Sequence, residues 1–271
     1  MKNRQSSRKK DITSIYTKAS IMVSKKILIF LSVFHIGNGF VYPAISKPQP
    51  HCISHSQHIL MASQPPQGSF PDIERPDPST LLAAQDEELQ RAAVIAIGGG
   101  ILGGTFLTYN LLSGLGDLLP YGFLDTVIDF TAPIPLGLLF ILFGGTHFVY
   151  KEGYAAIVPP NGSWGGLWNI PAPGAEKLGL SNEEFHVLWT GIAEIGGGLL
   201  LIAGALNALP IQIPAFLLFI LTLAVTPANI YMFTHDAQMS FAPPIDYPLG
   251  HLFRGIAQCV LLSIFLFLTF H

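Results

Sequence analysis

Five polar side chains stand inside long apolar stretches of this sequence: His147, Glu194, Asn229, Arg254 and Gln258. A charged side chain within a membrane-spanning helix costs about 2.5–3.5 kcal/mol on insertion scales, so Glu194 and Arg254 should face each other or a shared cavity. Imidazole and carboxyl groups can carry protons, whereas guanidinium and amide groups can donate hydrogen bonds to carbonyl oxygens. We therefore predict a Glu194–Arg254 ion pair within a ligand-binding site formed by all five residues.

The position of these residues along their stretches favours a shared site. At 1.5 Å per residue, they lie roughly one to two helical turns from the same end of their stretches. His251, Arg254 and Gln258 are spaced i, i+3 and i+7, so they share one helix face and could form the polar wall of a pocket. His235 and His251 lie close to the expected membrane interface, where we predict solvated side chains.

Each site residue also has a purely structural interpretation. Glu194 and Arg254 could form a lock between helices without binding a ligand. His147 could be a satisfied buried histidine or one that reaches the interface. Asn229 follows Pro227 and could cap the backbone carbonyls that this proline leaves without a donor.

The stretches that carry these residues have the length of membrane spans. Five uncharged apolar runs are near the twenty residues that cross about 30 Å of hydrocarbon. They are Ala92 to Leu112, Ala132 to Tyr150, Val187 to Leu206, Ile213 to Phe233 and Leu249 to Phe270. Such runs must be helical, because a single strand in lipid leaves its backbone unpaired. The predicted fold class is all-α, a polytopic transmembrane helical bundle.

The connecting segments predict an orientation. Residues 113–131 have an amphipathic, interfacial pattern, and residues 151–186 form a long loop whose Trp164 and Trp168 suit an aromatic belt. The basic loop residues that follow the N-terminal region fall on one side of the predicted membrane: Arg75, Arg91, Lys151 and Lys177. Positive charge stays on the side of insertion, so this side should be cytosolic or, in a plastid, stromal. Gly99 with Gly103, Gly100 with Gly104, and the triplet 196–198 are small faces expected to pack between helices.

Composition excludes several classes of protein. Half of the residues are hydrophobic, 11% are charged and the mean hydropathy is +0.47, whereas soluble domains carry roughly 25% charged residues. From Phe40 onward, six basic residues stand against sixteen acidic ones, which excludes nucleic acid as a partner. The two cysteines form no CxxC motif, so neither a disulfide scaffold nor a cysteine zinc site is expected.

The N-terminal part is typical of targeting sequences. Residues 1–39 include a signal peptide whose effective start we place at Met22, and residues 40–75 form a transit peptide and linker poor in acidic residues. The Phe40 junction resembles that of the bipartite presequences of proteins sent to complex algal plastids, in the thylakoid or inner envelope membrane. A simple secreted or endomembrane signal followed by a linker is the alternative. Residues 76–131 then hold an amphipathic segment, the first span and an interfacial loop, and residues 132–271 hold four further spans.

Four motifs within residues 133–271 resemble the DoxX-like family of small four-helix membrane proteins. They are GLLFILFGGTHFVYKEGYAAIVPP, TGIAEIGGGLLLIAG, AVTPANIYMFTH and PLGHLFRGIAQ. The resemblance implies a four-helix core, here with one preceding transmembrane helix. It also implies a link to quinone-dependent oxidoreductase systems, from which the family takes its name. The five site residues fall within these motifs.

Two functions from different classes follow. In the first, the polar site binds a lipophile such as a quinone, with hydrogen bonds from Arg254, His147 or Asn229, protons carried by Glu194 and His147, and electrons supplied by a partner. In the second, the protein is a non-catalytic structural subunit or assembly factor of a plastid membrane complex, and the glycine-rich first helix is a docking surface. Neither assigns a catalytic residue or a metal site, and the lipid bilayer is a partner in both.

Overall fold

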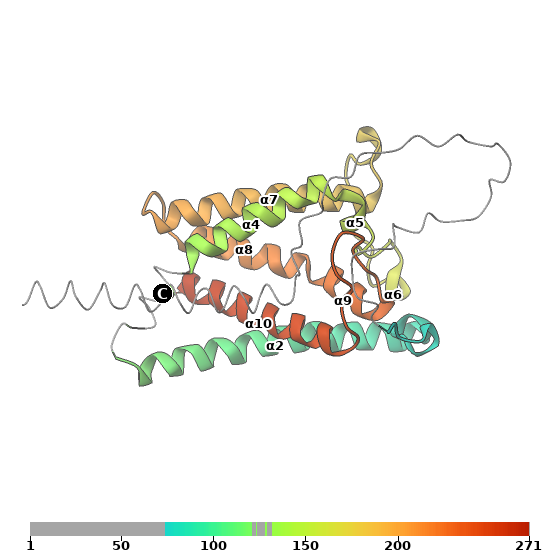
Figure 1. The fold of residues 1–271 in the computed structure, drawn as a ribbon, viewed down its shortest axis with the longest axis horizontal. Coiled ribbons are helices and arrows are strands. Elements are labelled where there is room, and N and C mark those ends of the chain that lie inside the picture. Colours follow the sequence, from blue (N-terminus) through green and yellow to red (C-terminus); the bar gives the residue numbers. More distant parts are fainter. Residues whose placement is uncertain (1–73, 121–122, 124–127, 129–131, 271) are drawn as a thin grey trace, which may run out of the picture. The chain divides into compact units, whose positions relative to one another are not determined.

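The computed structural model describes residues 74–120, 123, 128 and 132–270, and every regular element in this part of the chain is a helix (Figure 1). The long helices are α2 (Glu87–Leu118), α4 (Pro133–Val149), α7 (Asn182–Ala205), α8 (Gln212–Ala224), α9 (Thr226–His235) and α10 (Leu249–Phe270). The short ones are η1 (Pro78–Thr80), η2 (Leu82–Ala84), α5 (Lys151–Ala155), α6 (Ser163–Gly166) and η3 (Glu176–Leu178). The predicted signal peptide and most of the predicted transit peptide lie outside the described residues.

Four helical segments are long and apolar enough to cross a membrane, so the chain is a polytopic integral membrane protein. They are Glu87–Gly116, Asn182–Ala205, Gln212–His235 and Leu249–Phe270. The predicted second span forms α4, which is apolar but has 17 residues and is shorter than these four. The structure thus supports four of the five predicted spans by length.

Capping residues determine where the helices of the first and third predicted spans begin. α2 begins earlier than predicted because Asp86 accepts a hydrogen bond from the Leu89 amide, and the acidic residues that follow suit the positive end of the helix dipole. It also runs on to Leu118, so the start of the predicted interfacial segment is helical. α7 begins at a capping box, in which Ser181 and Glu184 satisfy each other's backbone amides.

The predicted fourth span is interrupted. α8 ends at Ala224 and α9 begins at Thr226, with Val225 between them. Pro227 explains the interruption, because it has no amide hydrogen to donate to the preceding turn and its ring crowds the carbonyl four residues earlier. Polar groups near this break therefore become available for contacts with another helix.

α4 and α7 approach each other through glycines. A Cβ atom on Gly137 would lie 2.7 Å from the Gly198 carbonyl oxygen, and one on Gly144 would lie 2.7 Å from the Gly191 carbonyl oxygen. In both helices the two glycines are seven residues apart, so they lie on one face. Gly197 and Gly198 therefore pack between helices as predicted, whereas a Cβ atom on Gly196 would meet nothing within 4 Å.

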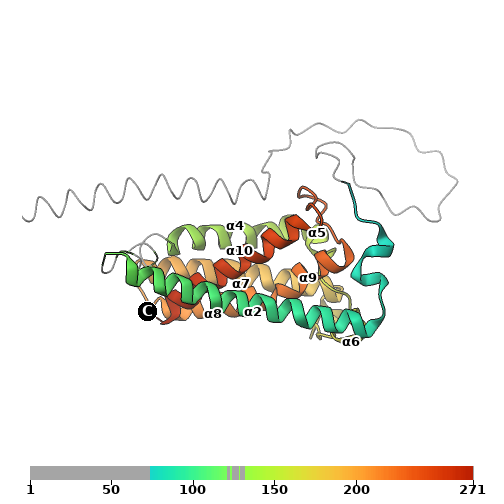
Figure 2. The ribbon, with the colours of Figure 1, turned by 90° about the horizontal axis from the view of Figure 1, so that it is seen from below.

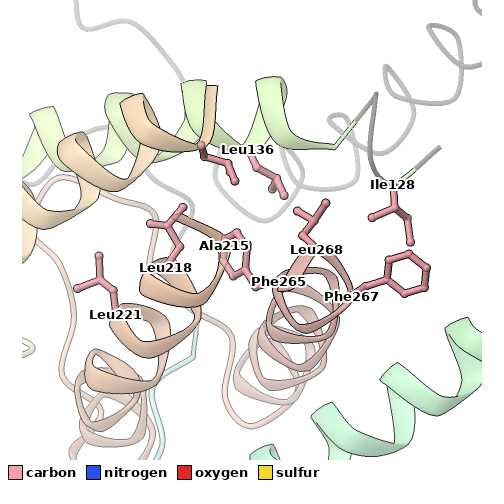
Figure 3. Close-up of a cluster of buried hydrophobic side chains, with 9 residues drawn as sticks. Ile128, Leu136, Ala215, Leu218, Leu221, Phe265, Phe267 and Leu268 are labelled. Carbon is pink, nitrogen blue, oxygen red and sulfur yellow. The ribbon is translucent and has the colours of Figure 1, made fainter. Parts of the chain in front are cut away.

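The remaining long helices surround an apolar core. α7 packs against α4 and α8, α8 packs against α10, and α10 packs against α2, which lies beside it in Figure 2. The core contains Ile128, Leu136, Leu201, Ala215, Leu218, Leu221, Phe265, Phe267 and Leu268, most of which Figure 3 labels. Most of these residues lie toward the ends of the helices opposite to α5 and α9, and the core extends to Leu221, next to the first polar residues.

The glycines of α2 differ from the prediction. A Cβ atom on Gly99, Gly100 or Gly103 would meet no other atom within 4 Å, whereas one on Gly104 would meet the Cys259 sulfur. Only the last of these four glycines therefore packs within the described chain. α2 also exposes large apolar side chains, including Phe106, which is 65% exposed.

Candidate functional site

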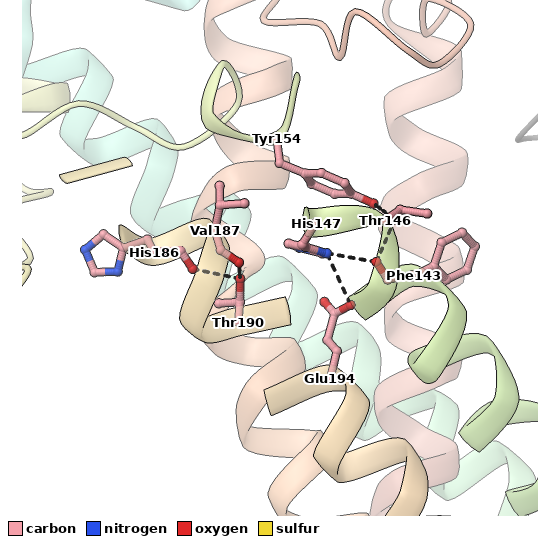
Figure 4. Close-up of polar contacts among 8 residues, drawn as sticks. All are labelled: Phe143, Thr146, His147, Tyr154, His186, Val187, Thr190 and Glu194. Atoms are coloured by element: carbon pink, nitrogen blue, oxygen red, sulfur yellow. Dashed lines mark hydrogen bonds and ion pairs between the residues drawn. The ribbon is translucent and has the colours of Figure 1, made fainter. Parts of the chain in front are cut away.

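His147 and Glu194 form a buried polar pair between α4 and α7. The Nδ1 atom of His147 lies 3.7 Å from the Glu194 Oε2 atom and 2.9 Å from the Phe143 carbonyl oxygen (Figure 4). A carbonyl oxygen can only accept, so His147 Nδ1 carries the hydrogen and donates it to Phe143. Oε2 of Glu194 is buried without a hydrogen-bond partner among the described residues.

Tyr154 of α5 covers this pair. Its ring stacks on the His147 ring with centroids 3.8 Å apart, and its hydroxyl lies 2.7 Å from the Thr146 hydroxyl (Figure 4). Phe241, in the loop between α9 and α10, packs against Tyr154 with ring centroids 5.0 Å apart. Burial raises the pKa of the Tyr154 phenol, so it stays protonated at neutral pH. It donates its hydrogen to Thr146, because the Thr146 hydroxyl donates its own to the Phe143 carbonyl oxygen at 2.6 Å.

An ion pair and a glycine hold α5 in place. Lys151 Nζ donates to Glu184 Oε1 at 2.6 Å, and this hydrogen bond raises the pKa of Lys151. A Cβ atom on Gly153 would lie 2.5 Å from the Phe241 ring, so the ring packs directly on the backbone of α5. The cover over His147 is thus fixed to α7 at one point and to Phe241 at another.

Arg254, Asn229 and Gln258 form a second polar network, between α9 and α10. Arg254 donates to Asn229 Oδ1 at 2.5 Å, and Asn229 Nδ2 donates to Gln258 Oε1 at 3.0 Å. Gln258 Nε2 in turn donates to the Thr226 hydroxyl at 2.6 Å and approaches the Thr222 carbonyl oxygen at 3.4 Å. These hydrogen bonds tie α10 to the interruption between α8 and α9.

The structure brings the five predicted site residues together as two groups. Among the described residues, Glu194 faces His147 and Arg254 faces Asn229, so the predicted Glu194–Arg254 ion pair is not formed. The reason is the helix order, since α7 packs on α4 and α8, whereas α10 packs on α8 and α2. The charges of Glu194 and Arg254 both act on the Tyr154 phenol.

Two structural interpretations of polar residues are corrected. Asn229 does not cap the carbonyls near Pro227, because its amide group bonds to Arg254 and Gln258 instead. His251 is not solvated, since it is 9% exposed and its ring packs against Phe233. Its Nε2 atom is buried without a hydrogen-bond partner in the described part of the chain.

The loop between α4 and α7 folds inward at its first tryptophan. Trp164 is 3% exposed, packs with Val94 and Ile230, and donates from Nε1 to the Thr234 hydroxyl at 3.2 Å. It is therefore an interior residue and not part of an aromatic belt. Trp168 is half-buried beside His186.

Sequence reasoning missed Tyr154 and Thr226. Tyr154 lies in a short helix outside the predicted spans, where an aromatic residue carries no special signal. Thr226 is a small polar residue in an apolar stretch, where threonine usually bonds to its own helix. Its position directly before Pro227 is the signal that could have identified it, because the freed backbone there attracts polar partners.

Comparisons with protein-family models, curated proteins and solved structures find no match to the chain. The fold and the polar groups alone define its class, which is that of small polytopic helical membrane proteins with buried polar residues between the helices.

Proposed function

We propose that this protein binds a small lipophilic molecule with a polar head, of the quinone class, at the His147–Glu194 pair. The observation that carries the proposal is the buried Oε2 atom of Glu194, which has no hydrogen-bond partner among the described residues. Buried polar atoms are normally paired, and ionisable residues inside membrane helices usually serve a function. A ligand hydroxyl could supply the missing hydrogen bond.

The neighbouring residues suit the two oxidation states of such a ligand. Glu194 can accept a hydrogen bond from the hydroxyl of a quinol, and Nε2 of a protonated His147 could donate one to the carbonyl of a quinone. His147 lies between Glu194 and Tyr154 and can exchange a proton with the carboxylate. The electrons must come from a partner protein, so the chain acts here as an accessory component of a membrane oxidoreductase system.

The family, the orientation and the organelle belong to the same proposal. The order of the four DoxX-like motifs supports a four-helix core formed by α4, α7, α8 with α9, and α10, preceded by α2. α4 would then be a fifth span, because 17 residues is the lower limit of length for crossing the hydrocarbon. The distribution of basic loop residues supports a stromal location for the ends of the helices that carry the polar groups, and residues 1–75 support targeting to a plastid.

The alternative function is that of a structural subunit or assembly factor. The network from Arg254 through Asn229 to Gln258 favours it, because these side chains satisfy one another between helices without a ligand. The open glycines of α2 favour it too, since small residues let another helix approach closely. In this case a stoichiometric protein partner replaces the ligand.

Replacing Glu194 with glutamine is expected to weaken ubiquinol binding by at least about tenfold, the effect of losing a charge-assisted hydrogen bond. The measurement is titration of ubiquinol and ubiquinone onto protein in lipid nanodiscs, followed by tryptophan fluorescence. Glu183→Gln is the matched control, because it makes the same change in the first turn of α7.

Equal binding by the Glu194→Gln variant and the wild type would contradict the site. Native purification followed by mass spectrometry separates the two functions. A bound lipophile lost from Glu194→Gln supports the binding protein, whereas a stoichiometric protein partner without a lipophile supports the structural subunit.

A further inference from the structure

Two helices of the bundle begin with nearly the same sequence. Residues 134–142 in α4 read IPLGLLFIL and residues 213–221 in α8 read IPAFLLFIL, which differ only at two adjacent positions. α4 begins at Pro133 and α8 at Gln212, each one residue before the shared segment. The two segments therefore match both in sequence and in the point where the helix starts.

The helices that follow them share a second segment. Residues 191–194 in α7 read GIAE and residues 255–258 in α10 read GIAQ. α7 packs against α4, and α10 packs against α8. In Figure 1, α4 and α8 run in one direction and α7 and α10 in the other. The chain thus contains two helical hairpins of the same orientation with matching segments in both arms.

The polar contacts also repeat at the aligned positions. His147 aligns with Thr226, and Glu194 aligns with Gln258. His147 donates to the carbonyl four residues earlier at 2.9 Å and lies 3.7 Å from Glu194. Thr226 donates to the carbonyl four residues earlier at 3.0 Å and accepts from Gln258 at 2.6 Å. The bond to the same helix is common for threonine, so the aligned side-chain contact between the two arms is the stronger similarity.

We infer that α4–α7 and α8–α10 are two copies of one helical hairpin, and that Thr226–Gln258 is the neutral counterpart of the His147–Glu194 pair. Parallel repeats of this kind occur in other membrane proteins. The comparison separates the role of holding two helices together from that of binding a ligand. A polar pair is present at this position in both copies, but it is ionisable in the first copy alone.

The difference between the pairs assigns the ligand to one copy. In the second hairpin, Gln258 is hydrogen-bonded through both ends of its amide group, so the pair is a lock between helices. In the first hairpin, Glu194 keeps an unpaired Oε2 atom. The ligand position therefore belongs to the first hairpin and has no second site in the other copy. This assignment rests on the proposed function, whereas the duplication itself does not.

The copies differ at the close contact of the first hairpin. Gly137 aligns with Phe216, which is 48% exposed, and Gly198 aligns with Leu262. The second hairpin consequently lacks these glycine contacts between its helices, and its polar network takes a larger part in holding the helices together. Arg254 and Asn229 extend that network at positions where the first hairpin has Thr190 and Tyr150.

The double substitution His147→Thr/Glu194→Gln tests the inference by placing the neutral pair in the first hairpin. If the hairpins are equivalent, the new side chains can form the hydrogen bonds of Thr226 and Gln258. We expect a melting temperature within a few degrees of the wild type and loss of ubiquinol binding. The reversed pair, His147→Gln/Glu194→Thr, has the same composition in the wrong places and should melt at least about 5 °C lower.

The melting temperatures test whether the two hairpins are copies, and the ubiquinol titration tests whether the ligand binds in the first hairpin. A neutral pair that melts as low as the reversed pair overturns the equivalence of the hairpins. Full ubiquinol binding by the neutral-pair variant overturns the assignment of the ligand to the first hairpin. If the wild type binds no ubiquinol, the proposed function fails, while the comparison of the two variants still decides whether the hairpins are copies.

Discussion

Replacing Asn229 with leucine is expected to destabilise the protein by about 3–5 kcal/mol, because it leaves a charged guanidinium between helices without its partner. Arg254 donates to Asn229 Oδ1, and the other end of the same amide group donates to Gln258. Leucine shares the branching of asparagine at Cγ, although it is larger, and can replace neither hydrogen bond. Thermal unfolding in detergent, followed by circular dichroism, should show the loss as a drop of about 6–20 °C in melting temperature.

The control for this prediction removes the charge instead of its partner. Arg254→Met keeps an unbranched side chain of similar length and takes away the group that needs pairing, so it should cost less than Asn229→Leu. Combining both substitutions should recover part of the stability lost in Asn229→Leu alone, since the two residues are coupled. Equal and additive losses would show that the Arg254–Asn229 hydrogen bond does not hold α9 to α10.

The contrast between these partners and the sequence prediction has a physical origin. Hydropathy along the chain gives the extent of α7 and α10 and the depth of Glu194 and Arg254, because length and polarity are properties of one helix. It does not give the order of helices around the bundle, which depends on side-chain packing between segments. Opposite charge alone therefore predicted an ion pair between α7 and α10, although α7 packs mainly on α4 and α8, and α10 mainly on α2 and α8.

The interrupted fourth span also shows that the sequence does not reveal which side chains meet between helices. Pro227 was recognised as a source of unpaired carbonyls, and Asn229 was the nearest side chain able to bond them. In the structure, Gln258 from another helix and Thr226 from the same one bond to the Thr222 carbonyl, which is next to the Leu223 carbonyl that Pro227 leaves without a donor. Local sequence identified the backbone that needs partners, while the identity of the partners depended on the packing of α10.

The glycine pattern predicted which helices have small faces but not which of these faces pack within the chain. Spacing of three or four residues marks a small helix face, but both α2 and α7 have such faces. In α7 the face meets α4, whereas in α2 Gly99 and Gly103 have nothing within 4 Å of a Cβ atom. Which small face is used inside the chain depends on a matching small face opposite it, and Gly137 with Gly144 supplies this for α7.

Replacing Gly198 with alanine is consequently expected to lower stability by about 1–3 kcal/mol, as overpacking of a close contact does. The added Cβ atom would lie 2.5 Å from the Gly137 carbonyl oxygen, so α4 and α7 must move apart. Because backbone and not a flexible side chain is in the way, a change of rotamer cannot relieve the contact. The melting temperature in detergent should fall by about 2–12 °C.

Gly196→Ala is the matched control, because a Cβ atom there meets nothing within 4 Å and alanine favours helix. This variant should melt at or above the temperature of the wild type. The separation of the helices in Gly198→Ala would also pull Glu194 away from His147, so its ubiquinol binding should weaken although no site residue is changed. If Gly198→Ala and Gly196→Ala melt alike, the glycine faces do not set the distance between α4 and α7, and the buried pair must be positioned by the cover from α5 instead.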